Sequence, residues 1–97
     1  MEEKINTIII KSMDSVAVVI EALPAGCLAL VKVNGEVRRI TATEDIPIYH
    51  KIAMFDMAAG QEVYKYGESI GRALVSIKAG QHVHSHNLVS IRETIAK

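Results

Sequence analysis

Branched aliphatic residues in short runs are the feature that most limits how this chain can fold. Isoleucine and valine supply 23 of its 97 residues, and their runs are bounded by glycine, proline, asparagine or aspartate. Branched side chains pack well on a pleated sheet, whereas they lose rotamer freedom in a helix. The pattern therefore predicts an all-β, or mostly β, fold of short strands and tight turns, with at most short helical turns.

Turn residues divide the chain into candidate strands. Asn34-Gly35 is the clearest signal, because both residues tolerate positive φ and can close a two-residue hairpin. Three Ala-Gly pairs, at 25–26, 59–60 and 79–80, indicate one turn that is used three times. Residues 88–97 fit either a helix or a final strand. The predicted strands span residues 6–11, 16–21, 27–33, 36–43, 51–56, 69–77 and 82–86.

The size and charge of the chain limit its partners. We expect one domain at residues 1–97, with a core over about 6–90 and a C-terminal tail at 91–97. A domain this small buries a modest share of its surface, which favours a covering partner, and a homo-oligomer is one candidate. Eleven basic residues balance eleven acidic ones, so we expect neither a nucleic-acid nor a membrane partner.

Cys27 is the only cysteine, so the chain cannot form an internal disulfide. It stands in an apolar run, which predicts a small buried core residue in a reduced compartment. The charged N-terminus and its short apolar run do not resemble a signal peptide. These features predict a cytoplasmic protein.

His82, His84 and His86 alternate with Val83 and Ser85. In an extended chain all three histidines point to one face, with the first and third roughly 13 Å apart. One ion would therefore take an adjacent pair, or need a bend, and would need further ligands from elsewhere. Imidazole suits zinc, iron, copper or nickel, so the segment predicts a divalent metal site without selecting the ion. The alternative is a polar edge strand with solvated histidines.

A second polar set consists of His50, Lys51, Lys65 and Tyr66. Together these side chains suit a carboxylate ligand, and Gly67 permits a close approach of the backbone. The alternative is that the lysines are ordinary strand-end charges and that Tyr66 packs its ring. No acid and base pair stands out, so the catalytic residue is unassigned, with His50 as the candidate because imidazole titrates near neutral pH.

Three motifs follow one another along the second half of the chain: Ile46-Pro47-Ile48-Tyr49-His50-Lys51, Lys65-Tyr66-Gly67 and His82-Val83-His84-Ser85-His86-Asn87. In order and spacing they resemble the N-terminal SAF domain of altronate and galactarate dehydratases. Two positions depart from that family's pattern, since Tyr49 replaces a glycine and Ser15 replaces an asparagine.

The resemblance implies a β-clip SAF fold beside a large catalytic subunit. It implies the small subunit of an altronate dehydratase-like hydro-lyase, inactive alone, that takes part in metal-assisted β-elimination of water from a sugar acid. The implied cofactor is a divalent metal, with iron(II) as one candidate. Two alternatives stay open: a small subunit of a sulfo-lyase acting on a hydroxy sulfonate acid, and a non-catalytic module that binds a sugar acid. The implied metal ligands are His82, His84 and His86, and the implied substrate contacts are Lys51, Lys65, Tyr66, Gly67 and Asn87.

Overall fold

The computed structural model describes residues 4–9 and 11–90. Within these ranges the chain forms strands and turns without a helix, so the predicted all-β fold is confirmed. None of the described elements is a helix of the length and apolar character that crossing a membrane requires. In chain order the strands are β1 (Thr7–Ile8), β2 (Val16–Val19), β3 (Leu28–Val33), β4 (Glu36–Thr41), β5 (Lys51–Ala53), β6 (Glu62–Lys65), β7 (Glu68–Ala73), β8 (His82–Val83) and β9 (Leu88–Ser90).

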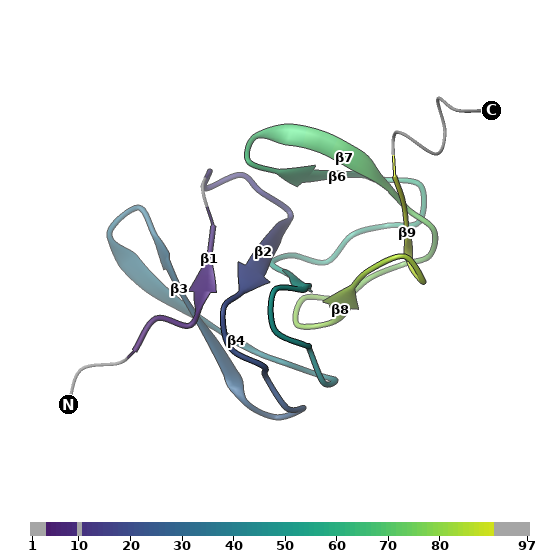
Figure 1. The fold of residues 1–97 in the computed structure, drawn as a ribbon. Helices are drawn as coiled ribbons and strands as arrows, with labels where there is room; N and C mark the ends of the chain where they lie inside the picture. The colour runs from purple at the N-terminus through teal and green to yellow at the C-terminus, as the bar shows by residue number, and fades with distance from the viewer. Residues whose placement is uncertain (1–3, 10, 91–97) are drawn as a thin grey trace.

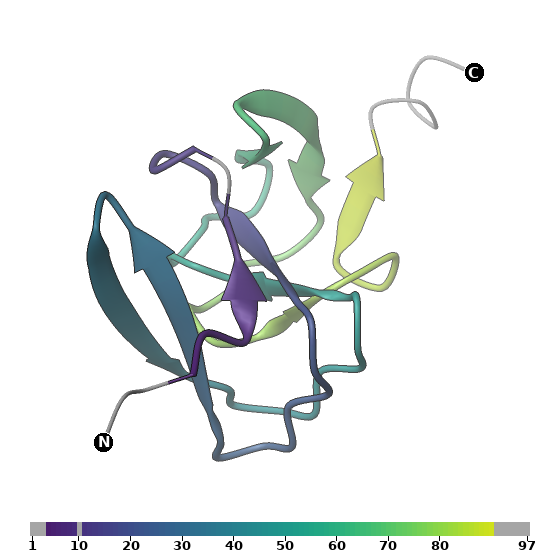
Figure 2. The same ribbon diagram turned by 60° about the vertical axis from the view of Figure 1, so that its left-hand side comes forward.

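The strands form two sheets (Figure 1). The larger sheet has the order β4-β3-β1-β2-β5-β8, and the smaller has the order β6-β7-β9. In Figure 1 the β3–β4 hairpin lies at the left and the β6–β7 hairpin at the top. Figure 2 shows β9 running beside β7, with which it pairs antiparallel. Strand β8 is an edge of the larger sheet, and this position determines how His82 is held.

Both long hairpins close through two residues with positive φ. Asn34 and Gly35 have φ angles of 50° and 84° between β3 and β4, so the predicted hairpin is confirmed. Tyr66 and Gly67 have φ angles of 58° and 79° between β6 and β7. This is the type I′ pattern, whose twist matches that of the strands. Sequence analysis missed β6, because it did not read Tyr66-Gly67 as a hairpin turn.

Within the part of the chain that the structure describes, one four-residue turn is used four times. Its third residue has positive φ, and the N–H of its fourth residue donates to the carbonyl of its first at 3.0 Å in every copy. The reuse predicted from the three Ala-Gly pairs is confirmed. A fourth copy was missed, because a tyrosine stands where the other copies have glycine. The turns span 24–27, 47–50, 58–61 and 78–81, with positive φ at Gly26, Tyr49, Gly60 and Gly80.

Two apolar clusters form the core, and β5 contributes to both. Ile52 and Met54 belong to the cluster that includes β2, β3 and β4 residues. Ala53 belongs to the second cluster, with residues of β6, β7 and β8. Successive side chains of a strand point to opposite faces, which explains this division. Strand β5 therefore lies between the two cores.

Some sequence predictions are wrong. Strand β8 ends at Val83, and a turn follows where we predicted an extended chain to residue 86. Strand β7 ends at Ala73 rather than at residue 77. Cys27 is exposed rather than buried, because it closes the 24–27 turn before β3 begins. Residues 88–90 form β9, whereas the rest of that segment and the predicted tail at 91–97 lie outside the described residues.

Candidate metal centre

Two paired strands bring three histidines together. Strands β5 and β8 pair antiparallel, with Ile52 opposite His82. Continuing this register places His50, immediately before β5, opposite His84, immediately after β8. Two copies of the repeated turn, 47–50 and 78–81, lead into these strands. Residues more than 30 positions apart therefore meet at one edge of the larger sheet.

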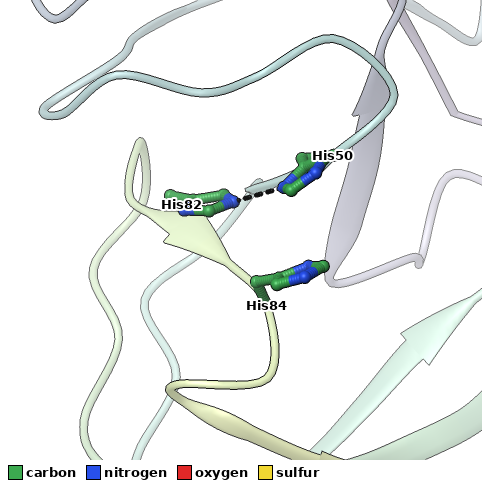
Figure 3. A group of neighbouring side chains, drawn as sticks. All are labelled: His50, His82 and His84. Carbon is green, nitrogen blue, oxygen red and sulfur yellow. Dashed lines mark hydrogen bonds between the residues drawn. The ribbon is translucent and has the colours of Figure 1, made fainter.

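The three imidazole rings lie in close contact (Figure 3). Nδ1 of His50 is 2.8 Å from Nε2 of His82. The ring centroids of His50 and His84 are 4.3 Å apart, and those of His82 and His84 are 5.6 Å apart. One nitrogen from each ring lies within 4.8 Å of the other two. We call these three residues the histidine centre.

The histidine centre fits a divalent transition-metal ion. Imidazole nitrogens lie about 2.0–2.1 Å from zinc, so two of them on one tetrahedral ion are about 3.4 Å apart. The three nitrogens lie within 4.8 Å of one another, so side-chain adjustments bring them to the spacing of ligands on one ion. Imidazole is a ligand that zinc, iron, copper and nickel accept. Three such ligands leave further coordination positions for another molecule.

His86 lies beside the histidine centre and is not part of it. Its ring centroid is 5.3 Å from that of His82, and the two rings are tilted by 37°. The turn after β8 brings His86 this close, since an extended chain would separate these side chains by roughly 13 Å. The structure thus joins His82 and His84 to His50, which sequence analysis had placed in the other polar set.

Side chains hold the main chain of the histidine segment. The N–H of His82 donates to the Glu44 carboxylate at 3.1 Å. The side-chain amide of Asn87 donates to the carbonyl of His82 at 2.8 Å, and its oxygen accepts the N–H of His84 at 2.9 Å. Asn87 is buried, and its predicted substrate contact stays a prediction. Sequence reasoning missed Glu44, because no local signal indicates a partner 38 residues away.

The surroundings favour neutral imidazoles. Burial lowers the pKa of His82, and the nearby histidines lower it further, whereas Glu44 raises it. Burial also lowers the pKa of His84, as do nearby histidines and Lys51. A metal ion binds the unprotonated nitrogen. Both residues therefore stay competent to bind at a lower pH than a free imidazole, whose pKa is about 6.5.

Lys51 lies on the other face of β5 from the histidine centre. In the pairing of β5 with β8, Lys51 lies opposite Val83, which belongs to the second core cluster. His82 lies opposite Ile52, the next residue of β5, and successive residues of a strand point to opposite faces. Burial and the charge of Lys65 lower the pKa of Lys51, so the two ammonium groups influence each other. Nζ of Lys65 lies 4.8 Å from the ring centroid of Tyr66. Two members of the predicted carboxylate set, His50 and Lys51, therefore point to opposite faces.

A buried carboxylate orders the Tyr66-Gly67 turn. Asp14 accepts the N–H groups of both turn residues at 2.8 Å, and that of Lys11 at 3.3 Å. These bonds help to hold Tyr66 at its φ of 58°, a conformation that a side chain disfavours. The backbone amide of Gly67 is thus already bonded within the domain, and its predicted substrate contact stays a prediction.

Comparison with known proteins gives three informative relatives. Altronate dehydratase of Escherichia coli is 41% identical over 78 residues, which cover 80% of this chain and 15% of that protein. The (2R)-sulfolactate sulfo-lyase subunit alpha of Chromohalobacter salexigens is 39% identical over 77 residues, which cover 77% of this chain and 82% of the relative. The corresponding subunit of Paracoccus pantotrophus is 49% identical over 49 residues, or 50% of this chain and 73% of the relative.

The match to a protein family covers most of the chain. The family profile described as the altronate/galactarate dehydratase SAF domain matches residues 5–91. This range contains all three motifs and the whole histidine centre. The resemblance noted in the sequence is therefore confirmed. The chain belongs to the family of altronate/galactarate dehydratase SAF domains.

Proposed function

We propose that this chain is the small subunit of a hydro-lyase of the altronate dehydratase type and acts on a sugar acid with a large catalytic chain. The histidine centre carries the proposal, because three imidazoles within 4.8 Å of one another form a ligand set for a divalent ion. The named relatives support the lyase class, since they are a dehydratase and a sulfo-lyase subunit. We expect the isolated chain to be inactive, because its clustered histidines are assigned to the metal ion and no other acid–base pair stands out in its sequence.

The bound ion supplies electrostatic stabilisation. His50, His82 and His84 would hold a divalent ion, for which iron(II) is one candidate, and the ion would supply electrostatic stabilisation to the oxygen atoms of a hydroxylated acid as the β-substituent leaves. The role of this chain is to hold the ion through His50, His82 and His84 and to orient the acid. His50 is also the candidate base, and the test below separates the two roles.

Lys51 and Lys65 are proposed to bind the carboxylate of the acid. Burial and the charge of Lys65 disfavour the ammonium form of Lys51 and lower its pKa. A bound anion would relieve this repulsion. The charge of Lys51 also lowers the pKa of His84, so Lys51 is electrostatically adjacent to the histidine centre. Tyr66, whose ring lies beside Lys65, is a further candidate contact.

A second candidate is the small subunit of a sulfo-lyase. The observation that favours it is coverage, because this chain spans 82% of a sulfolactate sulfo-lyase subunit alpha and 15% of altronate dehydratase. The same centre and lysines serve both reactions, since both eliminate a β-substituent from a carboxylic acid. The leaving group separates them: water in one case and sulfite in the other.

Reconstitution tests the proposal. The chain is mixed with the large altronate dehydratase-type chain of the same genome and with iron(II). Altronate and sulfolactate are supplied separately, and substrate loss and sulfite release are measured. We expect turnover by the mixture and none by this chain alone. Turnover of sulfolactate alone would assign the sulfo-lyase, and binding of an acid without turnover would assign the non-catalytic module.

Variants assign the residues in the same assay. We expect His84→Ala to lower activity by roughly 100-fold or more and to remove bound metal. His86→Ala is the matched control, because His86 lies outside the histidine centre. If His50→Ala abolishes turnover but keeps the metal, His50 is the base rather than a ligand. Full activity of His84→Ala would contradict the proposed centre.

A further inference from the structure

We propose that Glu44 is a positioning residue of the histidine centre and that its carboxylate holds His82 in the geometry that binds a metal ion. The inference rests on the metal centre proposed above. Glu44 lies between β4 and the 47–50 turn, and outside the three sequence motifs. Glu44 and His82 are 38 residues apart in the sequence, so only the folding of the chain brings Glu44 to the histidine centre.

The position of β8 at the sheet edge explains why His82 needs such a partner. In an antiparallel pair, alternate residues direct their N–H and C=O groups toward the neighbouring strand and away from it. The carbonyl of Gln81 accepts the N–H of Ala53 at 2.9 Å, so Gln81 faces β5. The main-chain groups of His82 then face outward, where Glu44 accepts the N–H at 3.1 Å and Asn87 donates to the carbonyl at 2.8 Å. Both outward groups are bonded to side chains instead of a strand.

The backbone around Glu44 is fixed against the same segment. The N–H of Thr43 donates to the carbonyl of Gly80 at 3.0 Å. A Cβ added to Gly80 would lie 2.2 Å from the carbonyl oxygen of Thr41, so the two segments are in direct backbone contact. Residues 41–44 and 80–82 are therefore held against each other by backbone contacts. The carboxylate of Glu44 is held beside His82 and does not have to be ordered when a ligand arrives.

The charge of Glu44 adds to this positioning effect. Its carboxylate raises the pKa of His82, whereas burial and the neighbouring histidines lower it. A divalent ion at the centre would add two more positive charges. A carboxylate in this position offsets part of that charge, and outer partners of metal ligands commonly change metal affinity by about 10–100-fold. Glu44 thus has a geometric and an electrostatic contribution, which two substitutions can separate.

The test compares Glu44→Ala, Glu44→Gln and Asp45→Asn in the full chain. Glutamine keeps an acceptor oxygen and removes the charge. Asp45→Asn is the matched control, because this neighbouring acid accepts the N–H of Ala25 at 2.8 Å and not that of His82. All carry Cys27→Ser, since an exposed thiol is itself a zinc ligand. Two quantities are measured: hydrogen exchange of the His82 amide without metal, and the Kd for Zn²⁺ by calorimetry.

We expect Glu44→Ala to speed exchange of the His82 amide at least tenfold and to weaken Zn²⁺ binding about 10–100-fold. Glu44→Gln should keep most of the amide protection and bind Zn²⁺ with intermediate affinity, whereas Asp45→Asn should change neither quantity. The inference would be overturned if Glu44→Ala stayed within twofold of the parent chain in both the exchange rate of the His82 amide and the Kd for Zn²⁺. Glu44→Gln with an amide as unprotected as that of Glu44→Ala would also overturn it. A parent chain that binds no Zn²⁺ would refute the metal centre, and the exchange data would still decide whether Glu44 holds His82.

Discussion

At the scale of single residues, Tyr49 is the clearest departure from local preference. It has a φ of 68°, while the equivalent residues of the other three turns are Gly26, Gly60 and Gly80, with φ from 84° to 94°. A side chain in this region costs about 1 kcal/mol or more relative to glycine. The Tyr49 side chain is 71% exposed, so few contacts offset this cost within the domain. No local sequence rule places a turn at such a residue.

Tyr49→Gly should therefore stabilise the isolated chain. We expect the free energy of unfolding to rise by about 1 kcal/mol, which raises Tm by about 4–8 °C in a domain of this size. Gly26→Ala is the matched control, because an added Cβ there meets nothing within 4 Å and only the backbone conformation is disfavoured. It should lower Tm by a similar amount. A lower Tm for Tyr49→Gly in thermal unfolding would show that the ring contributes more than the strain removes.

At the scale of elements, the turn before β8 connects fold and site. Gly60 and Gly80 occupy the same place in two copies of the repeated turn, with φ of 84° and 94°. A Cβ on Gly60 meets nothing within 4 Å, whereas one on Gly80 would lie 2.2 Å from the carbonyl oxygen of Thr41. The two glycines therefore share a conformational requirement, and they differ in packing.

Gly80→Ala should damage both stability and the histidine centre. Gly60→Ala should lower the free energy of unfolding by about 1 kcal/mol, through backbone conformation alone. Gly80→Ala should lower it by clearly more, and it should also weaken Zn²⁺ binding, because the clash displaces the segment that carries His82. Denaturant unfolding and calorimetry measure the two effects. Equal stability losses with unchanged zinc affinity would contradict the backbone contact at Gly80.

The elements that sequence predicted well are those that local chemistry specifies. Asn34-Gly35 determines its hairpin by itself, and each Ala-Gly pair determines a turn. The histidine centre depends instead on the pairing of β5 with β8 and on the bend that Asn87 holds. Periodicity predicted three histidines on one extended face. The hydrogen bonds of Asn87 to the main chain of His82 and His84 instead hold a bend after Val83, and the pairing of β5 with β8 brings His50 to the group.

At the scale of the whole molecule, the centre makes stability depend on pH. The folded-state pKa values of His82 and His84 are lowered, mainly by burial. Below the ordinary value of about 6.5, the unfolded chain therefore binds protons that the folded chain does not. Acid thus favours the unfolded state. The free energy of unfolding falls as the pH decreases from about 6.5 toward the lowered pKa values of the folded chain.

We expect the free energy of unfolding of the metal-free chain to fall as the pH decreases from 7 to 5.5. Replacing His82 and His84 together by glutamine removes both titrating groups and should make this part of the curve flatter. Urea unfolding at a series of pH values measures the difference. A chain whose stability rises toward pH 5.5, or a double variant with an unchanged slope, would contradict the lowered pKa values.

The claim that His50, His82 and His84 form one metal centre is tested most directly by zinc titration of the metal-free Cys27→Ser chain. The imidazole nitrogens are followed by NMR during the titration. We expect one ion per chain, with simultaneous changes at Nδ1 of His50, Nε2 of His82 and one nitrogen of His84. The nitrogens of His86 should shift little. No stoichiometric binding, or binding that moves His86 and leaves His50 unchanged, would contradict the centre.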